Sequence, residues 1–527
     1  MTEPLAGFWI LVRHALRLDR VRLIVWVLGI AVIPVVTYAT YASLYPTLAD
    51  RISLGVTLQS NPSFSLLLGP ARNLGDAGGY TAWRTIGICA IFVGVMSILT
   101  VVRHTRTDEE TGRTELLAAG CVGRFAFLAA GVATAMIACV ATGLAIVVGL
   151  VASGAHPVGA VAYGLAAMLA GAVFAGVAAV AVQVGSFGRT AISLSVAVIA
   201  IAYLLRAWGD ASAFHWIAWV SPLGWTEKIS AFSENRWWTL GLPLALTIVL
   251  IGVAVALVAH RDFGRGLIAA HHGPADARPA LAGAYGLAWR LHRARLAGWA
   301  IGLAAYGALV GSVAQSIASV IAHSNLGQRF LGSGHNFVDL YLAEIINLMG
   351  IVATVYGIQA LLTARAEEVE GRVELLLSTP LTRGRWLASH LLFALAGSAI
   401  VVIVGGVGAG VTANLDGAPT SIGAVFWGSV AQIPAIWFIL ALTAALFGVM
   451  PRLSVLGWSI IAATFVIGFF GPLLKLPRLA LDLSVFTHLP HLPGGSVDAT
   501  PLVVLGLLAA ALLIVAMVGF RRRSITS

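Results

Sequence analysis

Long apolar stretches alternate with short polar segments along the whole chain. The stretches reach the roughly 18 residues that cross a bilayer as a helix. They do not alternate apolar and polar residues as the strands of a membrane barrel would. The pattern therefore predicts an all-α integral membrane protein with twelve spans, at residues 22–41, 83–102, 126–152, 159–184, 190–207, 239–259, 297–322, 343–364, 387–412, 421–448, 453–474 and 500–520.

The residues before the first span form an amphipathic pattern of their own. Residues 5–20 carry apolar side chains on one arc of a predicted helix, and Arg13, Arg17 and Arg20 lie on the other arc. Asp19 interrupts the apolar arc. Such a helix favours the inner membrane interface, with its arginines toward lipid phosphate. The alternative is a basic flank that only precedes the first span.

Three polar segments stand out among the connections. Residues 263–288 contain His271, His272, Pro274 and Pro279 and are predicted to be a cytoplasmic linker. Residues 208–238 hold six tryptophans, and residues 475–499 follow at the matching place later in the chain. Tryptophan favours the membrane–water boundary. Both of the latter segments are therefore predicted to lie outside.

One charged block occurs twice, at residues 106–124 and 365–383, with a constant offset of 259 and no gap. Such spacing indicates two fused copies of one unit, predicted at 1–262 and 289–527. Six spans per copy give both copies the same orientation, so the halves are predicted to be parallel repeats. The identical pairs are Arg106/Arg365, Glu109/Glu368, Gly112/Gly371, Arg113/Arg372, Glu115/Glu374, Leu116/Leu375, Leu117/Leu376 and Arg124/Arg383.

Composition agrees with a membrane location. The chain is 59% hydrophobic and 10% charged, whereas soluble domains carry about 25% charged residues. Most of the 32 Lys and Arg residues fall in segments that are cytoplasmic if both termini lie inside. The net charge of +10 is thus explained by topology, and no nucleic-acid partner is expected. The three cysteines fit neither a disulfide framework nor a metal site.

The repeated block lies between the second and third spans of each half, in the cytoplasmic segments 103–124 and 365–385. Its acidic residues are expected to begin a short helix, where the dipole is positive, and the leucines behind them form an apolar patch. A solvated loop would not need the same eight residues in both halves. The block therefore predicts a docking surface for a paired partner.

The pattern E-x-x-G-R-x-E-L-L, followed by proline and arginine in the second copy, resembles the cytoplasmic loop of ABC-2-type permeases, the membrane subunits of ABC exporters of the type V architecture. The fused twelve-span form looks most like actinobacterial permeases for drugs and polyketide antibiotics of the tetronasin type. The resemblance covers the whole chain. It implies a coupling helix that docks on an ATPase through Glu109, Gly112, Arg113, Glu115, Arg124, Glu368, Gly371, Arg372, Glu374, Pro380 and Arg383.

The first copy departs from this pattern, because Cys121 replaces the proline. The two docking sites are therefore expected to be unequal. The resemblance also implies that the second and fifth spans of each half line the cargo path. The candidates there are Phe92, Met96, Tyr203, Tyr356, Phe465 and Phe469. The alternative for each of them is ordinary packing between helices.

No segment of the form G-x-x-x-x-G-K-[ST] occurs, and Lys228 and Lys475 are the only lysines. The chain itself is expected to be no enzyme and to hold no cofactor. The resemblance implies that ATP and Mg²⁺ bind a separate ATPase subunit, most simply in two copies. The predicted function is ATP-driven export of lipophilic or amphipathic compounds across the cell membrane, with both termini cytoplasmic.

Two other classes compete with this prediction. An ion-coupled secondary multidrug carrier also has twelve spans in parallel halves, but it needs carboxylates near the membrane midplane, where these spans offer glutamines. A membrane-embedded transferase would need an acidic and histidine cluster. Its only candidates are Asp482, His488, His491 and Asp498, in a proline-rich loop.

Overall fold

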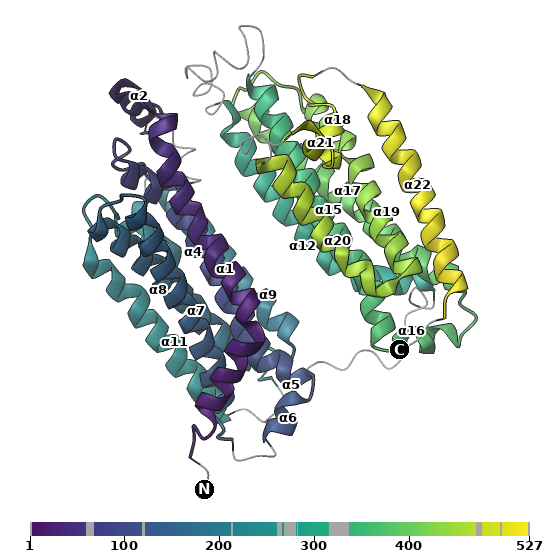
Figure 1. The fold of residues 1–527 in the computed structure, drawn as a ribbon, viewed down its shortest axis with the longest axis horizontal. Coiled ribbons are helices and arrows are strands. Elements are labelled where there is room, and N and C mark those ends of the chain that lie inside the picture. Colours follow the sequence, from purple (N-terminus) through teal and green to yellow (C-terminus); the bar gives the residue numbers. More distant parts are fainter. Residues whose placement is uncertain are drawn as a thin grey trace. The chain divides into compact units, whose positions relative to one another are not determined.

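The computed structural model describes residues 3–59, 68–118, 122–211, 214–260, 266–267, 281, 283–315, 337–470, 477–495 and 498–524. Within this part the chain is helical and contains no strand. Contacts divide the chain into two compact units, Met1–Gly273 and Pro274–Ser527 (Figure 1). Twelve of the described helices are long and apolar enough to cross a membrane. This confirms the all-α class and the predicted number of spans.

The first unit is built around small residues. Helix α8 packs against α4, α7 and α11, and most of its alanines and glycines are buried. A Cβ on Gly143 of α7 would lie 2.8 Å from the carbonyl oxygen of Gly164 in α8, so small residues let these backbones approach closely. The six long helices are α1 (Phe8–Leu44), α4 (Ala77–Val102), α7 (Ala126–Ala152), α8 (Pro157–Val184), α9 (Gly188–Ala211) and α11 (Gly241–His260).

The second unit has a similar tight pair, α12 against α17. Built Cβ atoms on Gly307 and Gly311 would lie 2.0 Å and 2.2 Å from the carbonyl oxygens of Gly405 and Ala409. No side chain fits between the two helices at these points. The long helices here are α12 (Ala284–Ser312), α15 (Phe337–Val369), α17 (Arg383–Leu415), α18 (Ile422–Ala431) with α19 (Ile433–Val449), α20 (Leu456–Phe465) and α22 (Ala499–Arg522).

Helix α1 differs from the sequence-based expectation. Residues 8–20 are helical, but they do not form a helix of their own, because one helix of 37 residues runs from Phe8 to Leu44. At 1.5 Å per residue it is about 55 Å long, against roughly 30 Å for the hydrocarbon core of a bilayer. The arginine-bearing part is therefore an extension of the first span and continues its axis.

The segment 208–238 consists of short helical turns. A 3-10 turn at His215–Trp219 is followed by α10 (Pro222–Lys228) and a second turn at Trp237–Leu240. Trp219 and Trp238 stack with ring centroids 5.6 Å apart. Ser221 begins α10, and its hydroxyl donates to the carbonyl of Ala202 in the preceding span at 2.6 Å.

A related serine stands in the second unit. Ser484 begins the 3-10 turn Val485–His488 and donates to the carbonyl of Thr464 in α20 at 3.5 Å. In both units, a buried serine thus ties the segment before the last span to the end of the fifth.

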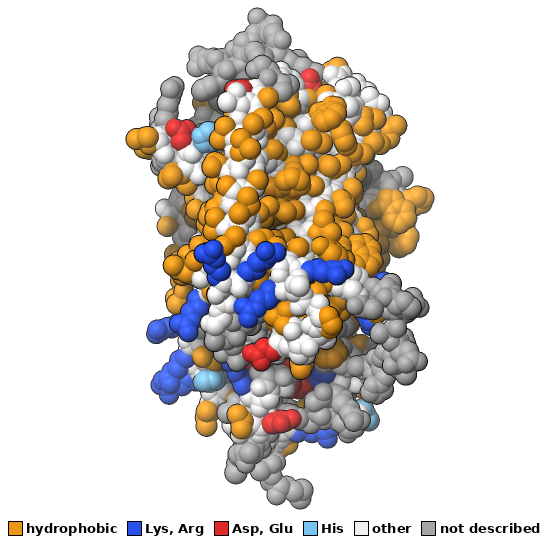
Figure 2. Space-filling model, turned by 90° about the vertical axis from the view of Figure 1, so that its right-hand side faces the viewer, with side chains coloured by type: hydrophobic (Ala, Val, Ile, Leu, Met, Phe, Trp, Pro, Cys, Tyr) orange, Lys and Arg blue, Asp and Glu red, His pale blue; other side chains and the backbone are white. Residues whose placement is uncertain are grey.

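The molecular surface agrees with a membrane location. The face drawn in Figure 2 carries a broad band of hydrophobic side chains, and Lys and Arg side chains gather along one edge of that band. An apolar belt with a basic border is the arrangement expected where a bilayer meets one aqueous side.

Candidate functional site

Each copy of the repeated block forms a six-residue helix, α6 (Arg113–Ala118) in the first unit and α16 (Arg372–Leu377) in the second. Gly112 and Gly371 separate these helices from the long helices before them, with φ angles of +71° and +72°. A Cβ at either glycine would meet no described atom within 4 Å, so the backbone angle, and not crowding, explains the glycine. The repeated glycine therefore fixes the turn from which each short helix leaves.

The two short helices present the same exposed face. Thr114 and Val373, which correspond by the offset of 259, are the buried anchors. The next residues, Glu115 and Glu374, are exposed. Behind them, Leu116 is 80% exposed and Leu375 is 73% exposed. We call these two exposed glutamate–leucine pairs the docking faces.

In the part of the chain that the structure describes, the docking faces have no ion-pair partner. Among the described residues, no salt bridge involves Glu115 or Glu374, whereas Arg113 lies 3.6 Å from Asp108 and Arg372 lies 3.6 Å from Glu367. An exposed leucine gains no free energy from burial, and the carboxylate beside it forms no ion pair among the described residues. Both docking faces are therefore suited to contact another molecule.

The prediction that the acidic residues begin the short helices is wrong for most of them. Asp108–Glu110 form the end of the long helix that starts with α4, and Glu367 and Glu368 lie in the last turns of α15. A helix C-terminus repels negative charge, so these carboxylates need other partners. Arg106 pairs with Glu109, and Glu110 accepts a hydrogen bond from the backbone N–H of Gly188, at the positive N-terminus of α9.

Besides Arg113 and Arg372, whose ion pairs are given above, four of the eleven predicted docking residues are engaged inside their own unit. Glu368 binds the two guanidinium nitrogens of Arg523, with Nη2 at 2.7 Å from Oε2, and Glu109 pairs with the buried Arg106. Arg124 donates to the carbonyls of Val258 and Ala259, at 2.8 and 3.0 Å.

The fourth residue, Arg383, donates to the carbonyls of Arg521 and Arg523, at 3.5 and 2.8 Å. The repeated arginines thus satisfy the free carbonyls at the C-terminal ends of α11 and α22. Arg113, Glu115, Arg372, Glu374 and Pro380 remain on the surface. Cys121 and the histidine pair 271–272 lie outside the described residues.

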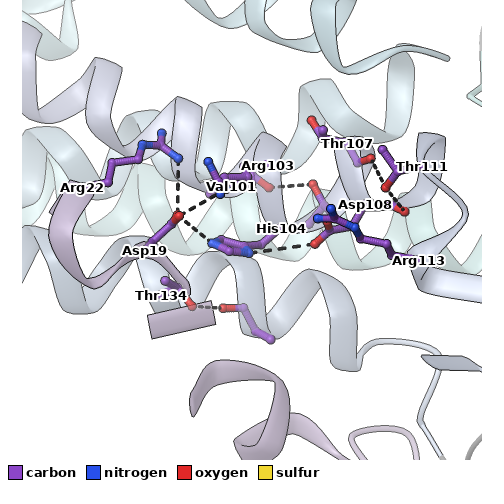
Figure 3. Close-up of polar contacts among 12 residues, drawn as sticks. Asp19, Arg22, Val101, Arg103, His104, Thr107, Asp108, Thr111, Arg113 and Thr134 are labelled. Carbon is purple, nitrogen blue, oxygen red and sulfur yellow. Dashed lines mark hydrogen bonds and ion pairs between the residues drawn. The ribbon is translucent and has the colours of Figure 1, made fainter. Parts of the chain in front are cut away.

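A buried polar network connects α1 to the short helix of the first unit (Figure 3). The carboxylate of Asp19 is 1% exposed. It lies 2.9 Å from Nε2 of His104, 3.2 Å from Nε of Arg103 and 3.3 Å from Nη1 of Arg22. We call these four residues with Asp108 the Asp19 network, because Nδ1 of His104 lies 3.9 Å from Asp108.

The Asp19 network reaches the first residue of the short helix α6. Asp108 lies 3.6 Å from Arg113, the first residue of α6. His104 stands in a single π-helical turn, Arg103–Thr107, which interrupts the helix that continues from α4. Isolated π-turns occur frequently at functional sites. Sequence analysis missed this network, although Asp19 on an apolar arc was a signal for a buried charge.

The second unit has different polar contacts at the corresponding place on its second span. Thr363 corresponds to His104 by the offset of 259, and Arg295 of α12 donates to its hydroxyl at 2.6 Å and to the carbonyl of Gln359 at 3.1 Å. One turn away, His292 and His390 meet with ring nitrogens 3.2 Å apart. Helix α12 therefore contributes the cation Arg295 at this position, whereas α1 of the first unit contributes the anion Asp19.

A second charged cluster lies at the other end of the first unit. Helix α9 starts beside the short helix α6, because the backbone N–H of Gly188 contacts Glu110. Arg206 and Asp210 lie near the other end of α9, at the end of the unit away from α6. There Arg206 lies 2.8 Å from Glu227, and Lys228 lies 3.3 Å from Asp210. We call these four residues the far-end cluster. The far-end cluster was not predicted from the sequence.

Glu227 is the unusual member of the far-end cluster. Burial and the neighbouring carboxylate of Asp210 raise the pKa of Glu227 to about 8, against the opposing effect of Arg206. One oxygen of Glu227 has no hydrogen-bond partner among the described residues. The residue lines a small pocket of about 40 Å³ together with Arg72, Trp83 and Ser230.

The structure separates the six candidates for the cargo path. Met96 and Tyr356 are fully buried in the cores of their units, and the hydroxyl of Tyr356 donates to the carbonyl of Phe393 at 3.1 Å. Phe92 is exposed on α4. Tyr203 and Phe465 are partly buried, and the side chain of Phe469 lies outside the described part.

Comparisons with known proteins converge on one family. The profile of the family described as "Multidrug efflux system permease Rv1217c, C-terminal domain" matches residues 12–261 and 281–521. A curated relative from Mycobacterium tuberculosis (strain ATCC 25618 / H37Rv), described as "Multidrug efflux system permease protein Rv1217c", is 36% identical over 526 residues. That match covers 98% of this chain and 94% of the relative.

Proposed function

Because this chain belongs to the Rv1217c family of multidrug efflux permeases, we propose that it is the membrane-spanning subunit of an ATP-driven exporter. Its cargo would be lipophilic or amphipathic compounds, including drugs. A separate ATPase, bound most simply in two copies, would supply ATP and Mg²⁺. The chain itself would move cargo and catalyse no reaction.

The observation that carries this proposal is the pair of docking faces. Two helices of the same length leave their long helices at matching glycines and expose the same glutamate and leucine. A partner that binds one face has the chemistry to bind the other. Two equal faces in one chain fit a partner present in two copies, as an ATPase that works in pairs would be.

The orientation follows from charge. The short helices, the arginines of α1 and the arginines at the end of α22 all lie at helix ends that the topology brings to one side of their own unit. Cytoplasmic segments carry an excess of Lys and Arg. We therefore assign both termini and both docking faces to the cytoplasm, where ATP is available.

An ion-coupled secondary carrier remains the second candidate, and the far-end cluster is the observation that favours it. Asp210 and Glu227 are buried carboxylates, and such groups are what proton-coupled carriers use. However, each already has a cationic partner in Arg206 or Lys228. We therefore favour a structural role for the cluster and ATP as the energy source.

The first test is purification of the tagged full-length chain from its own cells in mild detergent. Wild type should carry an ATPase with a Walker A sequence, and the Glu115→Arg/Glu374→Arg double variant should lose it. Asp416→Arg makes the charge change of one of these two substitutions on an exposed residue after α17, at the opposite end of the second unit, and should retain the ATPase. Absence of any ATPase from the wild-type preparation would contradict the proposal.

The second test is efflux of a lipophilic dye from vesicles that contain the purified complex. We expect transport to require ATP and to persist in the presence of an uncoupler. Transport that continues without ATP and stops with the uncoupler would favour the secondary carrier.

A further inference from the structure

The exposed side of α1 forms a groove with the neighbouring helix α7. The groove has a volume of about 480 Å³ and is lined by Trp9, Val12, Arg13, Leu16, Arg17, Arg20 and Ile137. Its floor is apolar, since Val12 and Leu16 come from α1 and Ile137 comes from α7. Its charged side chains are the three arginines.

The three arginines form one stripe. They lie at positions i, i+4 and i+7 of α1, which share a face of an α-helix. All three are exposed, and in the described part of the chain no carboxylate forms a salt bridge with any of them. The acidic residue nearest in sequence, Asp19, is buried and is engaged with Arg22, Arg103 and His104. The stripe therefore keeps its full positive charge.

The groove lies where phospholipid headgroups are expected. Helix α1 exceeds the bilayer core by roughly 25 Å, and its uninterrupted apolar part follows Arg22. The stripe covers about 10 Å of the axis just before that point. Trp9 stands at its far end and is 74% exposed. Exposed tryptophan and arginine beside the hydrocarbon boundary are typical of an interface with lipid headgroups.

We propose that this groove is a binding site for one anionic phospholipid, whose phosphate contacts Arg13, Arg17 and Arg20 and whose acyl chain covers Val12, Leu16 and Ile137. The charge selects an anionic headgroup over a zwitterionic one, and the apolar floor selects a lipid over a free phosphate. A basic pocket beside a spanning helix on the cytoplasmic side is a known kind of lipid site. The proposal requires no ATPase and stands apart from the proposed function.

Binding can be measured on the full chain in detergent by native mass spectrometry, with equal amounts of dioleoyl phosphatidylglycerol and dioleoyl phosphatidylcholine. We expect wild type to retain phosphatidylglycerol preferentially. Each arginine near an anionic surface contributes roughly a fivefold factor, so Arg13→Gln/Arg17→Gln/Arg20→Gln should weaken retention by about a hundredfold. The control Arg290→Gln/Arg293→Gln/Arg385→Gln removes the same charge from exposed positions of the second unit and should retain the lipid.

A second variant protects the test against misinsertion of the arginine-free chain. Ile137→Trp fills the groove from α7 and leaves every arginine in place, so it should also lose the lipid. Equal retention of both lipids by wild type would show an unselective apolar surface and would overturn the proposal. Undiminished retention of phosphatidylglycerol by the groove-filled variant would overturn it as well.

Discussion

Truncation of the exposed leucines of the docking faces gives the sharpest test of partner binding. Full burial of a leucine side chain contributes about 1.5–3 kcal/mol. Leu116 is 80% exposed and Leu375 is 73% exposed in the isolated chain, so most of that contribution is still available to a partner. An alanine retains part of it. Leu116→Ala or Leu375→Ala should therefore each weaken binding by about 1–2 kcal/mol, or roughly 5- to 30-fold.

The same exposure makes the test specific. An exposed leucine contributes little to the fold of its own unit, and exposed substitutions usually change stability by less than about 0.5 kcal/mol. The thermal unfolding of both variants should thus match wild type. The assay is equilibrium binding of the purified ATPase to the detergent-solubilised chain, measured by biolayer interferometry. Leu415→Ala, at an exposed position at the end of α17, serves as the control.

Unchanged affinity in both variants, with intact folding, would refute the assignment of α6 and α16 as docking helices. A loss in only one variant would mean that one face binds and the other does not. That result would keep the docking role but remove the argument for two bound copies.

Three further predictions concern the interior of the units. Asp19→Asn should lower the free energy of unfolding by about 2–3 kcal/mol, because three cationic or polar partners lose a buried carboxylate; thermal unfolding should show the loss, and Asp416→Asn should not. Gly371→Ala should lower the free energy of unfolding by about 1–2 kcal/mol, because the backbone is left-handed at that residue. Gly506→Ala, in open space on α22, should leave the free energy of unfolding unchanged in the same measurement. For Glu227 the pKa in the folded chain, about 8, lies above its ordinary value of 4.5, so its contribution to stability is complete below pH 4.5 and is lost as pH rises toward 8 and above. Wild type should therefore melt at a lower temperature at pH 9 than at pH 6, whereas Glu227→Gln should show a smaller difference; parallel curves for the two proteins would contradict the raised pKa.

The spans could be predicted from sequence because the length of an apolar run alone decides whether a helix can cross a bilayer. The repeated Gly112 and Gly371 were noticed as identities, and their reason, a left-handed turn, was visible only in the backbone. The continuity of α1 was missed because the composition changes at Val21. Yet no glycine or proline between Phe8 and Val21 breaks the helix, and this was the available signal.

The buried ion pairs could not be predicted in the same way. Asp19 and His104 are 85 residues apart in sequence, and nothing local pairs them. Arg124 and Arg383 were predicted to contact a partner because they are repeated, but they satisfy the carbonyls of α11 and α22 instead. A repeated residue can serve a structural role that both halves share. Here the repeated arginines bind the carbonyls at helix C-terminal ends, and repetition alone does not distinguish this role from partner binding.

The π-helical turn at Arg103–Thr107 has a consequence for symmetry. A π-turn accommodates more residues per turn than an α-helix, and each residue of an α-helix advances the direction of its side chain by about 100°. The corresponding residues of α15 stay α-helical, although the two copies of the block align without a gap. The docking face of the first unit therefore leaves its span with a different azimuth from that of the second. If a partner binds both faces in the same way, each second span has a different rotation about its own axis relative to its bound partner. The same motion of the two partners would therefore rotate the two spans by different amounts.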